Sequence, residues 1–278
     1  MGSFAQASSL CDGPIGIIGL GLIGGSLAKC LLEDTILGFD TDAGTIEKAM
    51  REGVIARGYT DCGRLQECEM VIIALPMKAE IELLKTCTFA RDATVMDVCG
   101  VKSVMDYVPK ELDYVSTHPM AGKEVGGYDN SDAKLFQDAN FILVGRNTTS
   151  DRAMARARQL GEVMGCGNIF TASREEHDEM VTFTSQLPHV LAACIVSLEQ
   201  YQHCHGYEGG SLADFTRIAQ MDSEMWSDLF LMNRKELVKV IGQLEGHLQQ
   251  VRLYLEEKDQ TSLHTFLSHA SKEREGHE

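Results

Sequence analysis

The sequence has no long apolar run, no excess of positive charge and no paired cysteine motif, and each absence excludes a class of protein. Among its 278 residues no stretch reaches the roughly 18 apolar residues of a membrane span, and we expect no secretory signal in residues 1–12. Lysine and arginine total 25 against 41 aspartates and glutamates, so the net charge of −16 argues against nucleic acid and anionic membranes as partners. An anionic substrate would have to be held by local cations.

The nine cysteines are odd in number and scattered, and no two form a C-x-x-C pair. This distribution is typical of reduced thiols, so we expect a cytoplasmic protein. We also expect no metal site. His203, Cys204 and His205 are consecutive and so point different ways on one turn, and no fourth ligand has the spacing that zinc sites require.

A short apolar segment runs directly into the pattern G-x-G-x-x-G and then into helix-forming sequence. Gly19 permits a tight turn, Gly21 lets the backbone approach a pyrophosphate, and Gly24 allows close packing of helix on strand. Leu22 and Ile23 stand at the N-terminus of the helix, which faces the phosphates. The pattern predicts a dinucleotide site, and the alternative is an ordinary turn between a strand and a helix.

Asp40 decides which dinucleotide is expected. It closes a second apolar run and lies 21 residues after Gly19. A carboxylate at this place accepts hydrogen bonds from the adenosine ribose and repels a 2′-phosphate. We therefore expect NAD rather than NADP.

The first half of the chain alternates strands with helices. Strands are predicted at 15–19, 36–39, 70–75, 93–98, 114–117 and 141–144, and helices around 22–33, 43–52, 78–87, 102–108 and 152–164. This alternation is typical of a Rossmann-type, doubly wound and mostly parallel sheet, with Leu75 and Pro76 at its ligand-binding carboxyl edge. From Ser173 onward the pattern is helical. We predict an NAD-binding domain over 1–172 and an all-α substrate and dimerisation domain over 173–278.

The second half of the chain predicts a helical bundle that does not bury itself alone. Residues 190–198 are apolar on all sides, which suits a helix buried on every side. Apolar residues from Trp226 to Leu255 recur at steps of three, four and seven over roughly eight helical turns. A second copy of the chain would cover this stripe, so we expect a homodimer through the helical domain.

Three segments carry candidate chemistry. His118 ends a predicted strand at the ligand edge of the sheet and is followed by Lys123. Gln186 and His189 lie three residues apart on one helical face, and so do Asp214 and Arg217, which follow a glycine-rich turn. Each segment has a structural alternative: a hydrogen-bonded strand-end histidine, a histidine at a helix start, or an exposed ion pair.

The order and spacing of these motifs resemble the prephenate/arogenate dehydrogenases of tyrosine biosynthesis. The resemblance covers nearly the whole chain. Its motifs are the glycine fingerprint at Gly19, the segments 97–102, 118–122, 187–189 and 214–219, and the pair Met225 and Trp226. It implies an NAD-dependent oxidative decarboxylation of prephenate to 4-hydroxyphenylpyruvate, in which formation of the aromatic ring drives the loss of hydride and carbon dioxide.

The resemblance also implies roles for individual residues. His118 would accept the proton of the substrate hydroxyl, Arg217 would bind a substrate carboxylate, and His189 would position substrate and nicotinamide. Substrate contacts are further expected from Gly210, Lys123, Gln186, Trp226 and Asp214, and cofactor contacts from Gly19, Gly21, Leu22, Ile23, Gly24, Asp40, Leu75, Pro76 and Gly100.

Two positions depart from the family pattern. Many members have serine at the position of Gly100, where it helps to orient the catalytic histidine, and many have histidine at the position of Gln186. Either a neighbour such as Ser103 or a water molecule orients His118, or the geometry differs. Lys123 favours prephenate over arogenate, because arogenate carries an additional ammonium.

Several functions remain open from the sequence. They are an arogenate dehydrogenase, another reductase of the same architecture such as a β-hydroxyacid dehydrogenase or a pyrroline-carboxylate reductase, and a non-catalytic NAD-sensing dimer. Only the first shares the motifs of the second half in this order.

Overall fold

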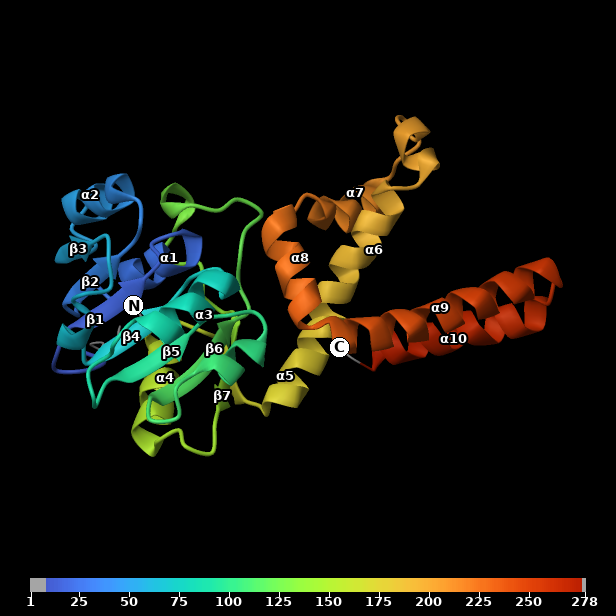
Figure 1. The fold of residues 1–278 in the computed structure, drawn as a ribbon. Helices are drawn as coiled ribbons and strands as arrows, with labels where there is room; N and C mark the ends of the chain where they lie inside the picture. Colours follow the sequence, from blue (N-terminus) through green and yellow to red (C-terminus); the bar gives the residue numbers. More distant parts are fainter. Residues whose placement is uncertain (1–8, 277–278) are drawn as a thin grey trace, which may run out of the picture.

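An eight-stranded sheet forms the core of the first lobe in the computed structural model, which describes residues 9–276 (Figure 1). The strands are β1 (Ile15–Ile18), β2 (Ile36–Phe39), β3 (Arg57–Tyr59), β4 (Met70–Ile73), β5 (Thr94–Asp97), β6 (Asp113–Pro119), β7 (Asn140–Gly145) and β8 (Asn168–Thr171). Their order is β3-β2-β1-β4-β5-β6-β7-β8, and only β6 and β7 pair antiparallel. The expected Rossmann-type, mostly parallel sheet is confirmed.

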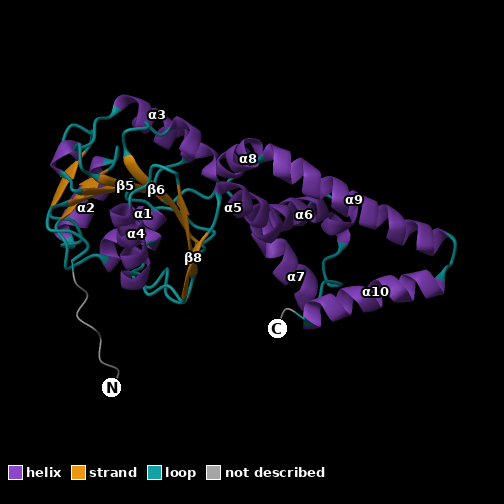
Figure 2. Cartoon of the chain, turned by 90° about the horizontal axis from the view of Figure 1, so that it is seen from below, coloured by secondary structure: helices purple, strands orange, loops and turns teal. Residues whose placement is uncertain are grey.

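Helices cover both faces of this sheet because its central strands are buried along their whole length. One face packs against α1 (Leu22–Cys30), α2 (Ala43–Arg51) and α4 (Asp151–Val163). The other face packs against α3 (Met77–Thr86) and a 3₁₀ segment, η2 (Lys102–Tyr107). Figure 2 shows α1 and α4 on the side of the sheet opposite α3.

The second lobe is helical throughout its described length and has two prongs (Figure 1). Its elements are α5 (Arg174–Val181), a π-helical turn η4 (Thr182–Gln186), α6 (Leu187–Val196), η5 (Glu199–His203), α7 (Gly210–Thr216), η6 (Arg217–Ala219), α8 (Ser223–Met232), α9 (Arg234–Glu256) and α10 (Gln260–Glu275). One prong consists of α6 and α7, and the other is the hairpin of α9 and α10.

The helical lobe is held against the sheet lobe by packing and by ion pairs. Leu229 and Met232 of α8 pack against the apolar cluster beneath α3. Lys78 of α3 pairs with Asp228 of α8 at 2.7 Å, and Arg174 of α5 donates to Asp106 of η2 at 2.8 Å. These contacts bring α5 and α8 to the carboxyl edge of the sheet.

One expectation for the helical lobe is wrong. The stripe from Trp226 to Leu255 is not one helix, because the chain turns at Asn233 between α8 and α9. The Asn233 amide donates to the Asp178 carbonyl, the Thr182 hydroxyl and the Gln186 amide oxygen, which anchors the corner. In the single chain Cys194 of α6 is exposed, so burial of residues 190–198 on every side stays a prediction for the dimer.

The expectation of reduced cysteines is wrong for one pair. A disulfide joins Cys62 to Cys87, whose Cα atoms are 6.2 Å apart, while the other seven cysteines are free. A separation of 25 residues carries no pairing signal, and only the packing of the segment after β3 near the end of α3 brings these residues together. Within residues 9–276 the structure contains no helix with the length and hydropathy to cross a membrane.

Candidate active site

The glycine turn after β1 has the geometry that a dinucleotide requires. Gly19 has φ +84°, and a Cβ there would lie 2.4 Å from the Ala74 carbonyl oxygen. A Cβ on Gly24 would lie 1.8 Å from the Gly19 carbonyl oxygen, so helix and turn are in direct contact. A Cβ on Gly21 would meet nothing within 4 Å, so the space in front of the N-terminus of α1 is open. Leu22 and Ile23 form the first helical residues there.

The Asp40 carboxylate is fixed against this turn. One oxygen accepts from the Leu20 backbone N–H at 2.7 Å, and the other accepts from the Asp42 backbone N–H at 2.9 Å. Because a carboxylate has about four acceptor sites, two remain for hydroxyl donors such as those of a ribose. The negative charge therefore stands at a defined place beside the glycine turn.

The remaining positions expected to contact the cofactor follow β4 and β5 at the same edge. Leu75 and Pro76 lie between β4 and α3, and Gly100 follows β5. A Cβ on Gly100 would lie 3.8 Å from Cε1 and Nε2 of the His118 imidazole and 3.8 Å from Leu229 of α8. Gly100 therefore borders His118 directly, and the sheet edge from Asp40 to Gly100 crosses four neighbouring strands, about 14 Å.

His118 lies near the carboxyl end of β6 and is half-buried. Its Nδ1 is 2.9 Å from Nε2 of His177, whose Nδ1 is 2.8 Å from an Asp178 carboxylate oxygen. The same Asp178 oxygen accepts from the Lys102 backbone N–H at 2.9 Å. Burial, the Lys102 ammonium and His177 together hold the pKa of His118 well below its usual value, so its imidazole is neutral at pH 7.

Buried charges lie beneath His118. The Lys102 ammonium donates to the Cys99 and Thr117 carbonyl oxygens at 2.6 and 2.8 Å and lies 3.5 Å from the Asp97 carboxylate. Burial and Asp97 raise the pKa of Glu80 well above its usual range, which makes Glu80 a neutral acid. The Lys102 ammonium therefore has the Asp97 carboxylate as its buried counter-charge, and it still lowers the pKa of the nearby His118 imidazole.

Arg217 reaches the loop that follows His118. Its guanidinium pairs with the Glu124 carboxylate, and its side chain remains 62% exposed. Lys123 donates instead to the Asn130 carbonyl at 3.0 Å. The anion beside Arg217 therefore comes from Glu124. The structural alternative, an exposed ion pair of Arg217 with Asp214 of α7, is not among the ion pairs of the described chain.

His189 and Trp226 form a stacked pair. Their ring centroids are 3.7 Å apart at an interplanar angle of 26°, and His189 Nδ1 is 2.8 Å from the Ser185 carbonyl oxygen. Trp226 lies three residues before Leu229 on α8, so the stacked pair and the contact with Gly100 share one face of that helix. The stacked pair thus joins α6 to α8, the helix that contacts Gly100 through Leu229.

Gln186 and Gly210 have different environments. Gln186 is 2% exposed, and its amide oxygen accepts from Asn233, so it supports the corner between α8 and α9. Gly210 begins α7 with open space where a side chain would stand.

His177, Asp178 and Lys102 were not assigned a role from the sequence. The available signal was weak: a histidine and an aspartate side by side in the first turns of the helix that opens the second lobe, and a lysine in an otherwise apolar segment. The contact of His177 with His118 spans 59 residues of sequence, and the contact of Asp178 with Lys102 spans 76.

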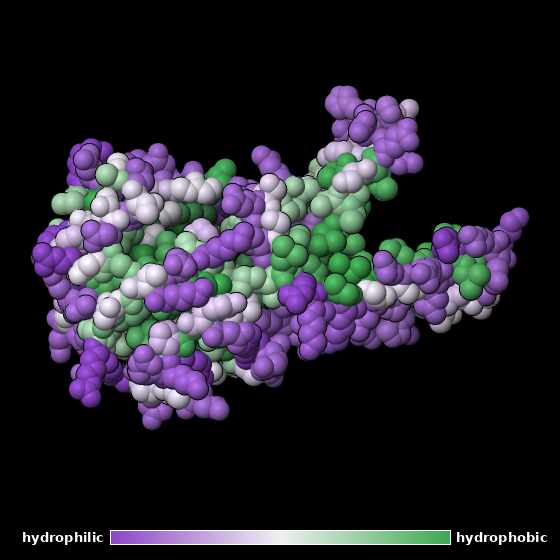
Figure 3. Space-filling model, viewed as in Figure 1, coloured by the Kyte–Doolittle hydropathy of each residue, from purple (hydrophilic) through white to green (hydrophobic). Residues whose placement is uncertain are grey.

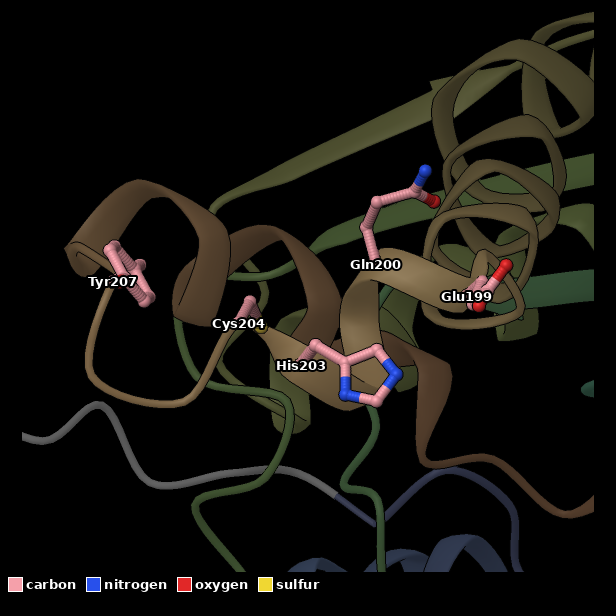
Figure 4. A pocket seen from close by; sticks show the side chains of 5 residues that line it. All are labelled: Glu199, Gln200, His203, Cys204 and Tyr207. Atoms are coloured by element: carbon pink, nitrogen blue, oxygen red, sulfur yellow. The ribbon is translucent and has the colours of Figure 1, made fainter.

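A cavity of about 490 Å³ lies elsewhere, at η5 on the tip of one prong. Figure 4 shows its five lining side chains, with Tyr207 and Glu199 at opposite ends and no common point toward which all of them converge. The lining is Glu199, Gln200, His203, Cys204 and Tyr207, none of which belongs to the expected site.

Two family models match the chain. Residues 23–169 match the model described as prephenate dehydrogenase, nucleotide-binding domain, and residues 173–269 match prephenate dehydrogenase, dimerization domain. The chain is 29% identical to the prephenate dehydrogenase of Bacillus subtilis, with 94% of this chain and 75% of the relative covered. It is also 29% identical to the cyclohexadienyl dehydrogenase of Zymomonas mobilis, over 88% and 89% of the two chains.

A solved structure is similar over its whole length. It is the prephenate dehydrogenase from A. aeolicus in complex with hydroxyphenyl propionate and NAD+. The TM-score is 0.84 at 27% identity, and the match covers 98% of this chain and 100% of the other.

Proposed function

The chain belongs to the prephenate dehydrogenase family, and on this premise we propose that it is an NAD-dependent prephenate dehydrogenase that converts prephenate to 4-hydroxyphenylpyruvate and carbon dioxide. One observation carries the proposal: a neutral imidazole, His118, stands at the sheet edge directly beside Gly100, on the edge that begins at the glycine turn and Asp40. A base at that place suits a reaction in which a hydroxyl loses its proton while hydride leaves the same carbon.

The residues at the edge fit NAD. Gly21 leaves room for a pyrophosphate at the N-terminus of α1, and Asp40 has free acceptor sites for the ribose hydroxyls while repelling a 2′-phosphate. The strands from β2 to β5 place Gly100 at the far end, where the nicotinamide is expected. When bound, NAD supplies the hydride acceptor.

His118 accepts one proton during the reaction and later returns it to the product. Its Nε2 accepts the proton of the substrate hydroxyl as the ring carbon gives up hydride, which leaves a ring carbonyl and an imidazolium. Loss of carbon dioxide from the opposite ring carbon then sends its electron pair into the ring, and the carbonyl oxygen takes the proton back as a phenolic hydroxyl. The two carboxylates of prephenate and the positive nicotinamide of NAD sum to one negative charge. The products have the same sum, because only the carboxylate of 4-hydroxyphenylpyruvate is charged, so no proton is released to solvent.

Arg217 is proposed to bind a substrate carboxylate, with His189 and Trp226 forming part of the wall. A guanidinium matches a carboxylate bidentately and keeps its charge, which meets the need for a local cation in a chain of net charge −16. In the structure the Arg217 guanidinium pairs with the Glu124 carboxylate. A substrate carboxylate would take the place of Glu124 in this pair. Substrate contacts from Gly210 and Asp214 remain predictions. The buried Gln186 amide oxygen already accepts a hydrogen bond from Asn233, so Gln186 would affect the site by stabilising the turn between α8 and α9.

Arogenate is a second candidate substrate, because of Glu124. The expectation that Lys123 disfavours arogenate loses its support, since Lys123 bonds to the Asn130 carbonyl. The anion beside Arg217 is a carboxylate, which would attract the ammonium that arogenate carries. Following absorbance at 340 nm with NAD and either prephenate or arogenate decides between them, and a panel of hydroxyacids tests other reductase activities. If none of these compounds reduces NAD, the dehydrogenase proposal fails and a non-catalytic NAD-binding dimer becomes the better reading.

We further propose a domain boundary between residues 172 and 173 and a homodimer through the helical domain. The last strand ends at Thr171, and Ser173 forms a capping box with Glu176 at the start of α5, which supports the boundary. Figure 3 shows hydrophobic residues gathered where the two prongs meet. Exposed apolar side chains of this lobe include Leu198, Leu231, Val238, Leu248, Leu255 and Leu267.

A second copy would remove this apolar surface from water. The family description as a dimerization domain supports the same assignment. A monomeric mass by light scattering at micromolar concentration would contradict the dimer. A cytoplasmic location stays a prediction.

A further inference from the structure

We propose that His177, anchored by Asp178, is the positioning residue that holds His118 with its proton on Nδ1 and a bare Nε2 facing the substrate. This inference rests on the proposed function only for the identity of the substrate. It assigns a role to two residues outside the motifs that indicated the activity.

The three side chains form one line from η2 to the sheet edge. The Lys102 backbone N–H and the Nδ1–H of His177 both donate to the same Asp178 oxygen, at 2.9 and 2.8 Å. His177 then meets His118 through Nε2 at 2.9 Å. His177 is 1% exposed and Asp178 is 9% exposed, so water has little access to these bonds.

The bonds determine which nitrogen of each ring carries a proton. A carboxylate only accepts, so the His177 nitrogen that faces Asp178 must carry its proton. In a neutral imidazole the other nitrogen is then an acceptor, and it faces Nδ1 of His118. His118 must therefore donate from Nδ1, which leaves its Nε2 with a lone pair.

His177 must be neutral for this assignment to hold. Burial lowers the pKa of His177 below its usual value, against the opposing effect of Asp178. The charged groups that act on the two rings are Lys102 from η2, Asp97 from β5 and Asp178 from α5. At pH 7 both rings are neutral, and a proton accepted at Nε2 of His118 makes an imidazolium whose Nδ1–H bond to His177 strengthens.

The alternatives that the sequence left open do not match the contacts. Gly100 offers no side chain, and the hydroxyl of Ser103 is buried without a hydrogen-bond partner in the described part of the chain. No water is needed at Nδ1 of His118, because His177 occupies that position directly. His177 of the second lobe thus contacts His118 in this chain, in which Gly100 stands where many family members have serine.

Three variants test the inference: His177→Ala, His177→Gln and the control Ser103→Ala. His177→Ala removes the acceptor, so kcat with prephenate should fall about 10- to 100-fold, while KM for prephenate and the Kd for NAD change less than about threefold. His177→Gln places an amide oxygen near the former Nε2 and should recover part of kcat. Ser103→Ala should behave as the wild-type protein.

A measurement without turnover accompanies the kinetics. Two-bond ¹⁵N–¹H NMR spectra report which imidazole nitrogen carries the proton, and a His118→Asn variant assigns the signals. His118 should show a protonated Nδ1 in the wild-type protein and in His177→Gln, and should lose this preference in His177→Ala. Thermal unfolding of each variant shows that the compared proteins are folded.

The outcomes separate the two proposals. The inference is overturned if folded His177→Ala keeps kcat within twofold of wild type, or if His118 carries its proton on Nε2 in the wild-type spectrum. If the wild-type protein turns over neither prephenate nor arogenate, the proposed function fails, and the NMR result alone decides the role of His177.

Discussion

Replacing Asp40 by alanine should change the preference between NAD and NADP by about 300- to 4500-fold. The lost charge-assisted bond to the ribose is worth about 1.5–3 kcal/mol, which corresponds to about a 10- to 150-fold weaker interaction with NAD. For NADP, the 2′-phosphate carries close to two negative charges, and each repels a carboxylate about 4 Å away by at least about 1 kcal/mol. Removing Asp40 therefore relieves about 2 kcal/mol, or about 30-fold. In the wild-type protein the Asp40 carboxylate cannot turn away from the 2′-phosphate, because the Leu20 and Asp42 backbone N–H groups hold it in place.

Asp42 provides a matched control for this prediction. Its carboxylate is exposed and caps α2 by accepting from the Gly44 and Thr45 backbone N–H groups. Asp42→Ala should lower the melting temperature but leave the ratio of kcat/KM for NAD to that for NADP unchanged. Asp40→Asn, which keeps one acceptor oxygen without the charge, should lose less NAD affinity than Asp40→Ala and gain a similar amount with NADP. The reasoning is refuted if the cofactor ratio of Asp40→Ala equals that of Asp42→Ala in steady-state assays at 340 nm.

Other predictions concern the substrate side. His118→Asn should lower kcat by about two to four decades with little change in the Kd for NAD, and retained turnover would exclude His118 as the base. Arg217→Ala should raise KM for prephenate about 10- to 150-fold with a smaller effect on kcat, and an unchanged KM would show that another group holds the carboxylate. Because His118 acts as a neutral imidazole and its pKa lies well below the usual value of 6.5, kcat/KM should stay level through pH 6.5 and fall only as the pH drops through that lowered pKa. An acid limb centred above pH 6.5 in the kcat/KM profile would contradict this.

Local sequence patterns predicted the architecture of the sheet lobe and the class of its cofactor. Alternating apolar strands and helices predict a doubly wound sheet, because each pattern reflects burial within one element. The glycine spacing and Asp40 predict the dinucleotide site, since these groups lie within one strand–helix–strand unit. The short β3, with only three residues, and the edge strand β8, with mostly exposed residues, escaped prediction because they carry little apolar periodicity.

Contacts between distant elements required the tertiary structure. The bond between His118 and His177 spans 59 residues, and the pair of Arg217 with Glu124 spans 93, so neither has a signal in local spacing. The turn at Asn233 likewise depends on acceptors from α5 and η4. The sequence by itself determined the architecture, the cofactor class and the candidate base, because periodicity and short motifs act within a few turns or strands. Only the docking of the helical lobe on the sheet edge decided which side chain orients that base and which anion faces the arginine, because hydrogen bonds and ion pairs depend on ångström-scale positions that two separately folded patterns do not specify.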